Sequence, residues 1–149
     1  MNSEITTHVR LNRDMQFTGS APSGHSVTLD APIPEGNGTG LTPMELVLIG
    51  LGGCSGMDVL AILRNKGQEI HSLDVRTRGQ RRDTNPTVFT QISLEFVISG
   101  VDIDHEAVAR AIETTHQRYC PVWTMLEQNV EISSHYRILS DEPVTTPCD

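Results

Sequence analysis

The chain has 149 residues and a formal net charge of −8 at pH 7, and its 37% hydrophobic and 4% aromatic content is that of an ordinary globular protein. This length fits one domain, so we expect a single domain over residues 1–149. The acidic balance argues against nucleic-acid binding, because no basic face is available to neutralise phosphates.

The ends of the chain and its cysteines bear on location. The N-terminal segment 1–10 has no apolar core like that of a signal peptide. The longest apolar run is interrupted by glycines and begins at a helix cap, which favours a buried helix over a membrane span. Three cysteines without a signal sequence indicate reduced thiols rather than a disulfide framework. We therefore expect a cytoplasmic protein that does not bind membranes.

The first third of the chain is predicted to form strands. Apolar and polar residues alternate over 4–12, and weaker strand patterns follow at 15–18 and 25–29, separated by a turn-rich segment. Residues 31–40 are rich in glycine and proline, and we expect a flexible loop there.

A long central helix is predicted over residues 42–66. Thr42 and Glu45 form a capping box, with Pro43 at the first helical position, and Gly67 is the C-terminal stop signal. The helix is apolar on nearly every face, so we expect it to be buried all round.

Within this helix, the seven-residue stretch 50–56 contains four glycines: Gly50, Gly52, Gly53 and Gly56. In a helix interior each costs about 1 kcal/mol relative to alanine. Close approach of another backbone, such as the same helix of a second subunit, would explain them.

The second half continues with two strands, two helices and a last strand. The predicted elements are strands around 73–76 and over 88–98, joined by a hairpin turn at 82–86, a helix over 103–118, a short helix from 122 and a strand over 130–138. This order predicts an α+β fold. The polar, proline-bearing segment 141–149 is expected to be a disordered tail.

Cys54 lies in the middle of the central helix. A buried cysteine is usually an inert core residue, and that interpretation stays open beside a reactive thiol. Asp58 follows four residues later and shares a helix face with Cys54. Its carboxylate would raise the thiol pKa, and it could also accept a hydrogen bond or pair with an arginine.

Cys120 directly precedes Pro121, which occupies the first position of a predicted helix, and the partial positive charge at that helix end favours a thiolate. His116, four residues earlier, could form half of a zinc site with Cys120 or could be a packed histidine. Further ligands at metal-like spacing are not evident, so we expect neither a metal nor a cofactor. Cys148, in the tail, is expected to be exposed and incidental.

Two motifs together resemble the OsmC/organic hydroperoxide resistance (OsmC/Ohr) family. One is T-P-x-E-L at 42–46 with a cysteine eleven residues after the proline, and the other is Y-C-P at 119–121 after a later helix. The resemblance runs from about Ile5 to Leu139, with strands and helices in the same order.

The resemblance implies a fold, a partner and a chemistry. Members are intertwined homodimers in which antiparallel sheets pack on long central helices, with each site at the interface. The peroxidases of the family are redox enzymes that reduce organic hydroperoxides, and an external dithiol regenerates them. Carried over by position, Cys54 is the peroxidatic and Cys120 the resolving cysteine.

Two positions depart from the peroxidase pattern. Those enzymes have a glutamate directly after the helix-starting proline, whereas this chain has Met44 there and Glu45 one place later, about 100° around the helix. They also hold the thiolate with an arginine from an early strand, and Phe17 lies near that position. Arg10 or Arg13 could replace the arginine in a different register. The chain is thus more similar to the OsmC-like branch.

Three functions follow from these residues. The leading one is a thiol-dependent reductase of bulky organic hydroperoxides that uses Cys54 and Cys120. The second is a non-peroxidatic member that binds a small apolar ligand at the dimer interface. The third is a metal-thiolate protein with Cys54, Cys120 and His116 as ligands.

Overall fold

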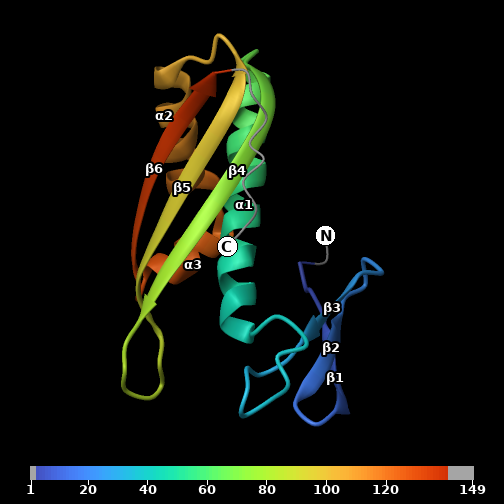
Figure 1. The fold of residues 1–149 in the computed structure, drawn as a ribbon. Coiled ribbons are helices and arrows are strands. Elements are labelled where there is room, and N and C mark those ends of the chain that lie inside the picture. The colour runs from blue at the N-terminus through green and yellow to red at the C-terminus, as the bar shows by residue number, and fades with distance from the viewer. Residues whose placement is uncertain (1–2, 141–149) are drawn as a thin grey trace. The chain divides into compact units, whose positions relative to one another are not determined.

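The computed structural model describes residues 3–140, and the chain divides into two compact units, Met1–Val47 and Leu48–Asp149 (Figure 1). The predicted tail at 141–149, with Cys148, lies outside the described residues. The α+β class is confirmed: residues 3–140 form three α-helices and two sheets.

The first unit contains an antiparallel meander. Its strands are β1 (His8–Arg13), β2 (Gln16–Ser20) and β3 (Ser26–Leu29), in the order β1-β2-β3. Asp14 has φ 50° in the tight turn after β1, and Gly24 has φ 88° between β2 and β3. Aspartate and glycine are the residue types that accept this left-handed conformation at low cost.

The loop over 31–40 is organised around one carboxylate. Asp30 is buried, and it accepts hydrogen bonds from the backbone N–H of Thr39 (3.0 Å), the Thr39 hydroxyl (2.5 Å) and the N–H of Ala31 (2.7 Å). The bonds from Thr39 hold the pKa of Asp30 below its ordinary value. The glycine- and proline-rich sequence therefore encodes an ordered loop here, where we expected a flexible one.

Helix α1 (Pro43–Asn65) has the predicted ends. The Thr42 N–H donates to Glu45 Oε1 (2.9 Å) and the Glu45 N–H donates to Thr42 Oγ1 (3.2 Å), so the predicted capping box is confirmed. Gly67 follows the helix with φ 75°, the conformation of a C-terminal glycine stop.

Three strands form the sheet of the second unit, in the order β4 (Glu69–Arg81), β5 (Phe89–Val101), β6 (Glu131–Ser140). β4 and β5 are the predicted hairpin and pair antiparallel, whereas β6 pairs parallel with β5. The expectation of wholly antiparallel sheets is wrong for this pair. The chain crosses over through helices before β6, and such a connection brings it back in the same direction.

The crossover contains α2 (His105–Thr114), the π-helical turn η1 (Thr115–Tyr119) and α3 (Pro121–Glu127). The inner face of α2 packs in the core, since Val108 and Ala111 are almost fully buried. The prediction of one regular helix over 103–118 is wrong at its end, because the last turn widens to π geometry.

Figure 1 shows the helices of the second unit on one face of its sheet. α1 packs closely on β4: a Cβ on Gly56 would lie 3.0 Å from Val75, and a Cβ on Gly52 would lie 3.2 Å from Thr77. These two glycines therefore serve helix-to-sheet approach.

The opposite side of α1 is uncovered by the other described residues, 3–140. Ile49 is 50% exposed and Met57 74% exposed, and a Cβ on Gly50 or Gly53 would meet no atom within 4 Å. One chain by itself therefore does not bury this helix all round, and its burial by a second subunit stays a prediction. α1 is long and apolar enough to cross a membrane, with a third of its most apolar stretch buried. A core helix passes the same test of length and composition, and Leu51, which is fully buried, marks the packed side.

Candidate functional site

Cys54 and Cys120 lie next to each other in the second unit. Cys54 comes from the middle of α1, and Cys120 lies between η1 and α3. Their sulfur atoms and a carboxylate oxygen of Asp58 are all within 4.8 Å of one another. Both cysteines are free; Cys54 is half-buried and Cys120 has no exposed surface. The fold thus brings together two thiols that are far apart in the sequence.

The π-helical turn and the start of α3 position Cys120. The Cys120 N–H donates to the Thr115 carbonyl (2.9 Å), which closes η1, and Cys120 is also the N-cap of α3. The sulfur accepts from the Trp123 N–H (3.4 Å) and lies 3.5 Å from Ser55 Oγ. A π turn of this kind often marks a functional site in a helix.

The surroundings of Cys54 disfavour its thiolate. Burial is the main cause that raises the pKa of Cys54 to about 11, and the hydrogen bond with Cys120 is the next. The N–H of Val122 at the start of α3 opposes this rise, and the charge of Asp58 makes a small contribution to it. The predicted effect of Asp58 therefore has the right sign, but Asp58 is not the leading cause.

Asp58 projects from the same side of α1 as Cys54. Its Oδ2 atom is buried and has no hydrogen-bond partner among residues 3–140. Burying a carboxylate oxygen without a hydrogen-bond partner costs free energy of folding, so the unpaired state of this atom needs an explanation.

His116 does not face the two sulfurs as a ligand. Its ring stacks on Trp123 (centroids 4.5 Å apart, planes at 19°), and its Nε2 lies 2.6 Å from Glu127 Oε2. The interpretation of His116 as a packed histidine agrees with these contacts. The interaction ties η1 to α3, on either side of Cys120.

The other predicted supporting residues lie in the first unit. Glu45 is bonded to Thr42 in the helix cap, and these bonds hold the pKa of Glu45 below its ordinary value. Arg10 and Arg13 are exposed on β1, and Phe17 on β2 is paired with Leu11 on β1 and Leu29 on β3. Their roles toward Cys54 stay predictions.

Sequence reasoning missed the backbone donors at the start of α3. The N–H groups of Val122 and Trp123 face the sulfurs of Cys54 and Cys120, respectively. The signal was present in the Cys120–Pro121 pair, because the residue before a helix-starting proline is an N-cap. The side chain of an N-cap accepts a hydrogen bond from the backbone N–H two or three residues later.

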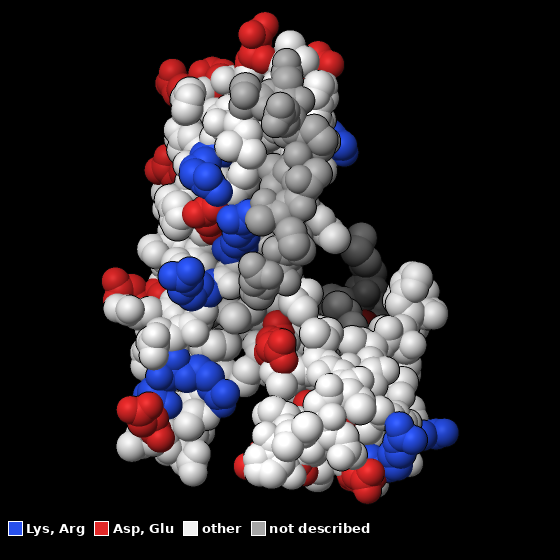
Figure 2. All heavy atoms as spheres, in the orientation of Figure 1, with Lys and Arg blue, Asp and Glu red and all other residues white. Residues whose placement is uncertain are grey.

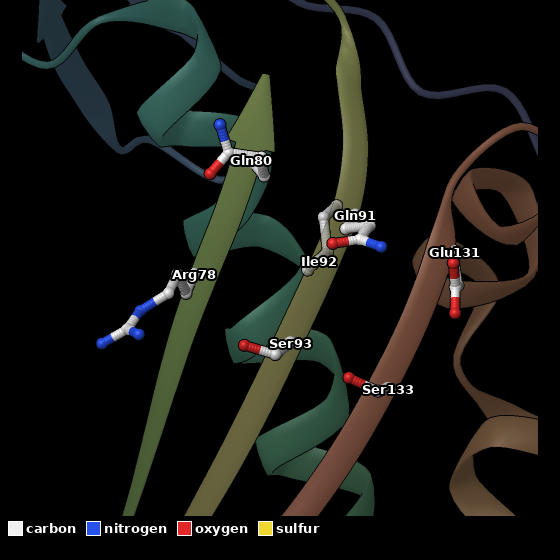
Figure 3. A pocket seen from close by; sticks show the side chains of 7 residues that line it. All are labelled: Arg78, Gln80, Gln91, Ile92, Ser93, Glu131 and Ser133. Atoms are coloured by element: carbon white, nitrogen blue, oxygen red, sulfur yellow. The ribbon is translucent and has the colours of Figure 1, made fainter. Parts of the chain in front are cut away.

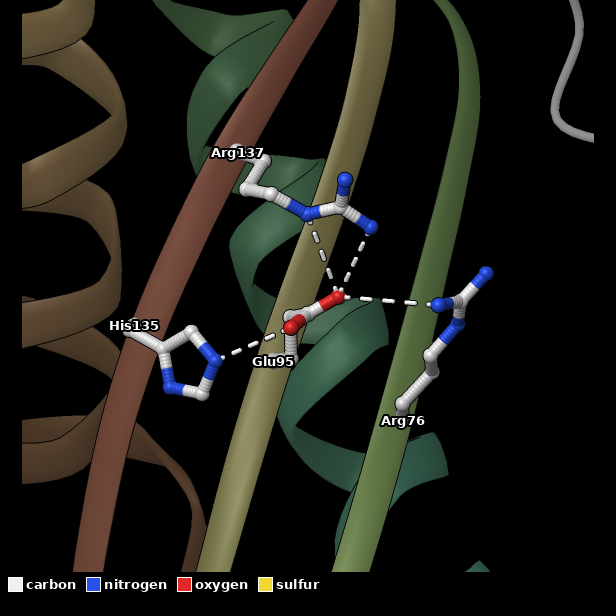
Figure 4. Close-up of polar contacts among 4 residues, drawn as sticks. All are labelled: Arg76, Glu95, His135 and Arg137. Carbon is white, nitrogen blue, oxygen red and sulfur yellow. Dashed lines mark hydrogen bonds and ion pairs between the residues drawn. The ribbon is translucent and has the colours of Figure 1, made fainter.

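An ion cluster lies on the face of the β4-β5-β6 sheet that the helices leave open. Figure 4 shows Glu95 on β5 between Arg76 on β4 and both His135 and Arg137 on β6, with separations of 3.7, 3.0 and 3.0 Å. The hydrogen bonds from His135 and Arg137 lower the pKa of Glu95. These are cross-strand neighbours on an exposed surface, so we interpret the cluster as sheet stabilisation.

A shallow hollow lies further along this face, with Arg78, Ser93 and Ser133 among its lining residues (Figure 3). Its side chains come from all three strands and include no cysteine. Basic and acidic side chains are interspersed over the visible part of this sheet face (Figure 2). The thiol cluster is therefore the stronger candidate for chemistry.

Comparisons with known proteins agree with the fold and the cysteine pattern. The family model for OsmC-like protein matches residues 36–135. The chain is 36% identical to protein YhfA of Escherichia coli strain K12 over 136 residues, which are 91% of this chain and 99% of YhfA.

Two solved structures illustrate the range of the fold. A hypothetical protein from Aquifex aeolicus VF5 superposes with a TM-score of 0.84 at 26% identity, covering 95% of this chain and 100% of that one. An organic hydroperoxide resistance protein OsmC from Legionella pneumophila superposes with a TM-score of 0.67 at 14% identity, covering 89% and 96%. The expected resemblance is confirmed, and the chain belongs to the OsmC-like family.

Proposed function

We propose that the protein is a thiol-dependent reductase of organic hydroperoxides, with Cys54 and Cys120 as its redox pair. The observation that carries the proposal is the convergence of two free cysteines from α1 and the start of α3, with sulfurs within 4.8 Å of each other. A disulfide requires the sulfurs to approach to about 2.05 Å, which a small local rearrangement would supply.

The family gives further support. The Legionella pneumophila relative is named for organic hydroperoxide resistance and as a predicted redox protein, and a structure of OhrB from Bacillus subtilis carries a similar name at a TM-score of 0.61. Their low identity to this chain speaks for the fold, so the chemistry rests on the cysteine pair.

In the proposed reaction, the Cys54 thiolate attacks the distal oxygen of the hydroperoxide. The O–O bond breaks, the alkoxide leaves as an alcohol after taking a proton, and Cys54 becomes a sulfenic acid. The Cys120 thiol then displaces water from this sulfenic acid and forms the disulfide. An external dithiol reduces the disulfide and is itself oxidised. The reducing environment of the cytoplasm suits this cycle.

The proposal includes a homodimer. The uncovered side of α1 presents Ile49, Gly50, Gly53 and Met57, an apolar stripe with small residues at its centre. Exposed apolar surface of this kind marks an interaction site, and the small residues would let a second α1 approach closely.

The function is tested with purified, reduced protein by following thiol loss with cumene hydroperoxide and with hydrogen peroxide. We expect faster loss with cumene hydroperoxide. Cys54→Ser should abolish peroxide consumption, whereas Cys120→Ser should allow one turnover and then stop, because the second thiol serves recycling. Cys148→Ser is the control and should turn over normally. A Cys54→Ser variant that consumes peroxide at the parent rate would contradict the proposal.

One observation favours the second candidate, a non-peroxidatic protein that binds a small apolar ligand. Burial and Cys120 raise the pKa of Cys54 to about 11, which leaves the nucleophile neutral at physiological pH. If neither peroxide oxidises the thiols while an apolar fluorescent probe binds at the α1 surface, this candidate takes the place of the first.

A further inference from the structure

The site around Cys54 holds three ligand atoms, and within residues 3–140 no cationic side chain pairs with its carboxylate. Two sulfurs and a carboxylate oxygen lie within 4.8 Å of one another. Asp58 forms no ion pair among residues 3–140, and its Oδ2 is buried without a partner. A cluster of negative or electron-rich donors with nothing to neutralise it is what a metal ion would complete.

The spacing suits a tetrahedral ion. Zn²⁺ binds thiolate sulfur at about 2.3 Å and carboxylate oxygen at about 2.0–2.2 Å, so its ligand atoms are about 3.5–3.8 Å apart. Contraction of the cluster by about 1 Å would reach that geometry, and side-chain rotation of Cys54 and Asp58 on one helix face can provide it. Cys54 is half-buried, which leaves a path for the ion and for a water ligand.

We propose that the reduced protein binds one Zn²⁺ per chain through Cys54 Sγ, Cys120 Sγ and the Asp58 carboxylate, with water as the fourth ligand. The sequence suggested His116 as the third protein ligand. His116 is instead engaged with Glu127 and Trp123, and Asp58 is the group that the structure brings to both sulfurs.

Binding releases protons and competes with oxidation. The two thiols lose one proton each when the zinc–sulfur bonds form, so the affinity should rise with pH. A Cys54–Cys120 disulfide has no thiolate to offer, so oxidation removes two of the three protein ligands at once. The zinc site is independent of the peroxidase proposal, because it is measured without peroxide.

The test uses the full-length chain with Cys148→Ser, so that the third cysteine does not contribute. Calorimetric titration with Zn²⁺ should give one ion per chain. Titration with Co²⁺ should give the thiolate-to-metal charge-transfer band and the visible bands of a tetrahedral site. Loss of a group that only hydrogen-bonds to a metal ligand costs about 10–100-fold in metal affinity. Asp58 is proposed as a direct ligand, so Asp58→Asn should weaken Zn²⁺ binding by at least about tenfold.

Matched variants make the result decisive. Glu95→Gln, which changes a carboxylate on the open face of the sheet, should leave the affinity unchanged, and the disulfide form should not bind. Cys54→Ser and Cys120→Ser should each abolish the charge-transfer band or cut its intensity, and they decide the question if Asp58→Asn fails to fold. Parent-like binding by folded Asp58→Asn, an equal loss with Glu95→Gln, or binding by the disulfide form would overturn the proposal.

Discussion

The half-buried thiol of Cys54 should respond slowly to alkylating reagents at neutral pH. Burial and Cys120 raise its pKa to about 11, so its thiolate fraction and its alkylation rate should increase by about tenfold per pH unit up to that value. The measurement is the rate of iodoacetamide modification of Cys54, by mass mapping, in reduced and metal-free Cys148→Ser protein.

The causes of this shift also predict an order among variants. Cys120→Ser should lower the pKa of Cys54 more than Asp58→Asn, because Cys120 contributes through its hydrogen bond and its charge while Asp58 contributes the smallest part. A Cys54 pKa below the ordinary thiol value of about 8.5 would show that a cation supports the thiolate.

At this scale the sequence identified the two cysteines and the sign of the effect of Asp58. It could not identify the leading causes of the Cys54 pKa, because burial and the contact with Cys120 depend on packing between α1 and α3. It also left His116 open between ligand and core residue. The stacking on Trp123 that decides this depends on the π turn before Cys120.

Among the elements, α1 begins at a cap whose contribution can be measured. In Thr42→Ala the Glu45 N–H loses its acceptor, and we expect a loss of about 0.5–2 kcal/mol in the free energy of unfolding. Thr84→Ala is the matched control, because Thr84 is exposed and offers Arg82 only its backbone carbonyl. Urea denaturation of both variants checks the prediction, and equal stabilities would contradict it.

The elements whose ends depend on local chemistry were predictable. A cap, a proline and a glycine stop bound α1, and alternation of apolar residues defined β5. The π turn was not predictable, because the apolar-face pattern of the preceding helix continues through Thr115, which is buried. The parallel pairing of β6 was missed for a different reason: alternation shows which face of a strand is buried and not the direction of its neighbour.

For the whole molecule, Gly53 distinguishes a monomer from the proposed dimer. Among residues 3–140 a Cβ added at Gly53 would meet nothing within 4 Å, so Gly53→Leu should stabilise a monomer through helix propensity by about 0.5–1 kcal/mol. In a dimer built on this face it should overpack and cost about 1–3 kcal/mol, with weaker association. We expect the second result.

Sedimentation and the concentration dependence of unfolding measure the difference. Gly56→Leu is the control, because Gly56 already lies against Val75 within the chain and should lose stability in either state. A parent protein that sediments as a stable folded monomer at micromolar concentration would refute the dimer. The sequence predicted an apolar helix on every face, and only the structure shows which half of that surface one chain leaves uncovered.

The parallel pairing of β6 with β5 also governs when the thiol pair can form during synthesis. The meander β1–β3 and the β4–β5 hairpin join neighbours in the chain, and such local contacts form early. β6 is the last described strand, and α2 and α3 contact it, so the crossover that carries Cys120 completes its packing after β6 has been synthesised. Until then Cys120, which the finished fold hides completely, stays accessible to oxidants in the nascent chain. The time spent in that open state, rather than the stability of the completed fold, sets the risk of wrong oxidation for each new molecule.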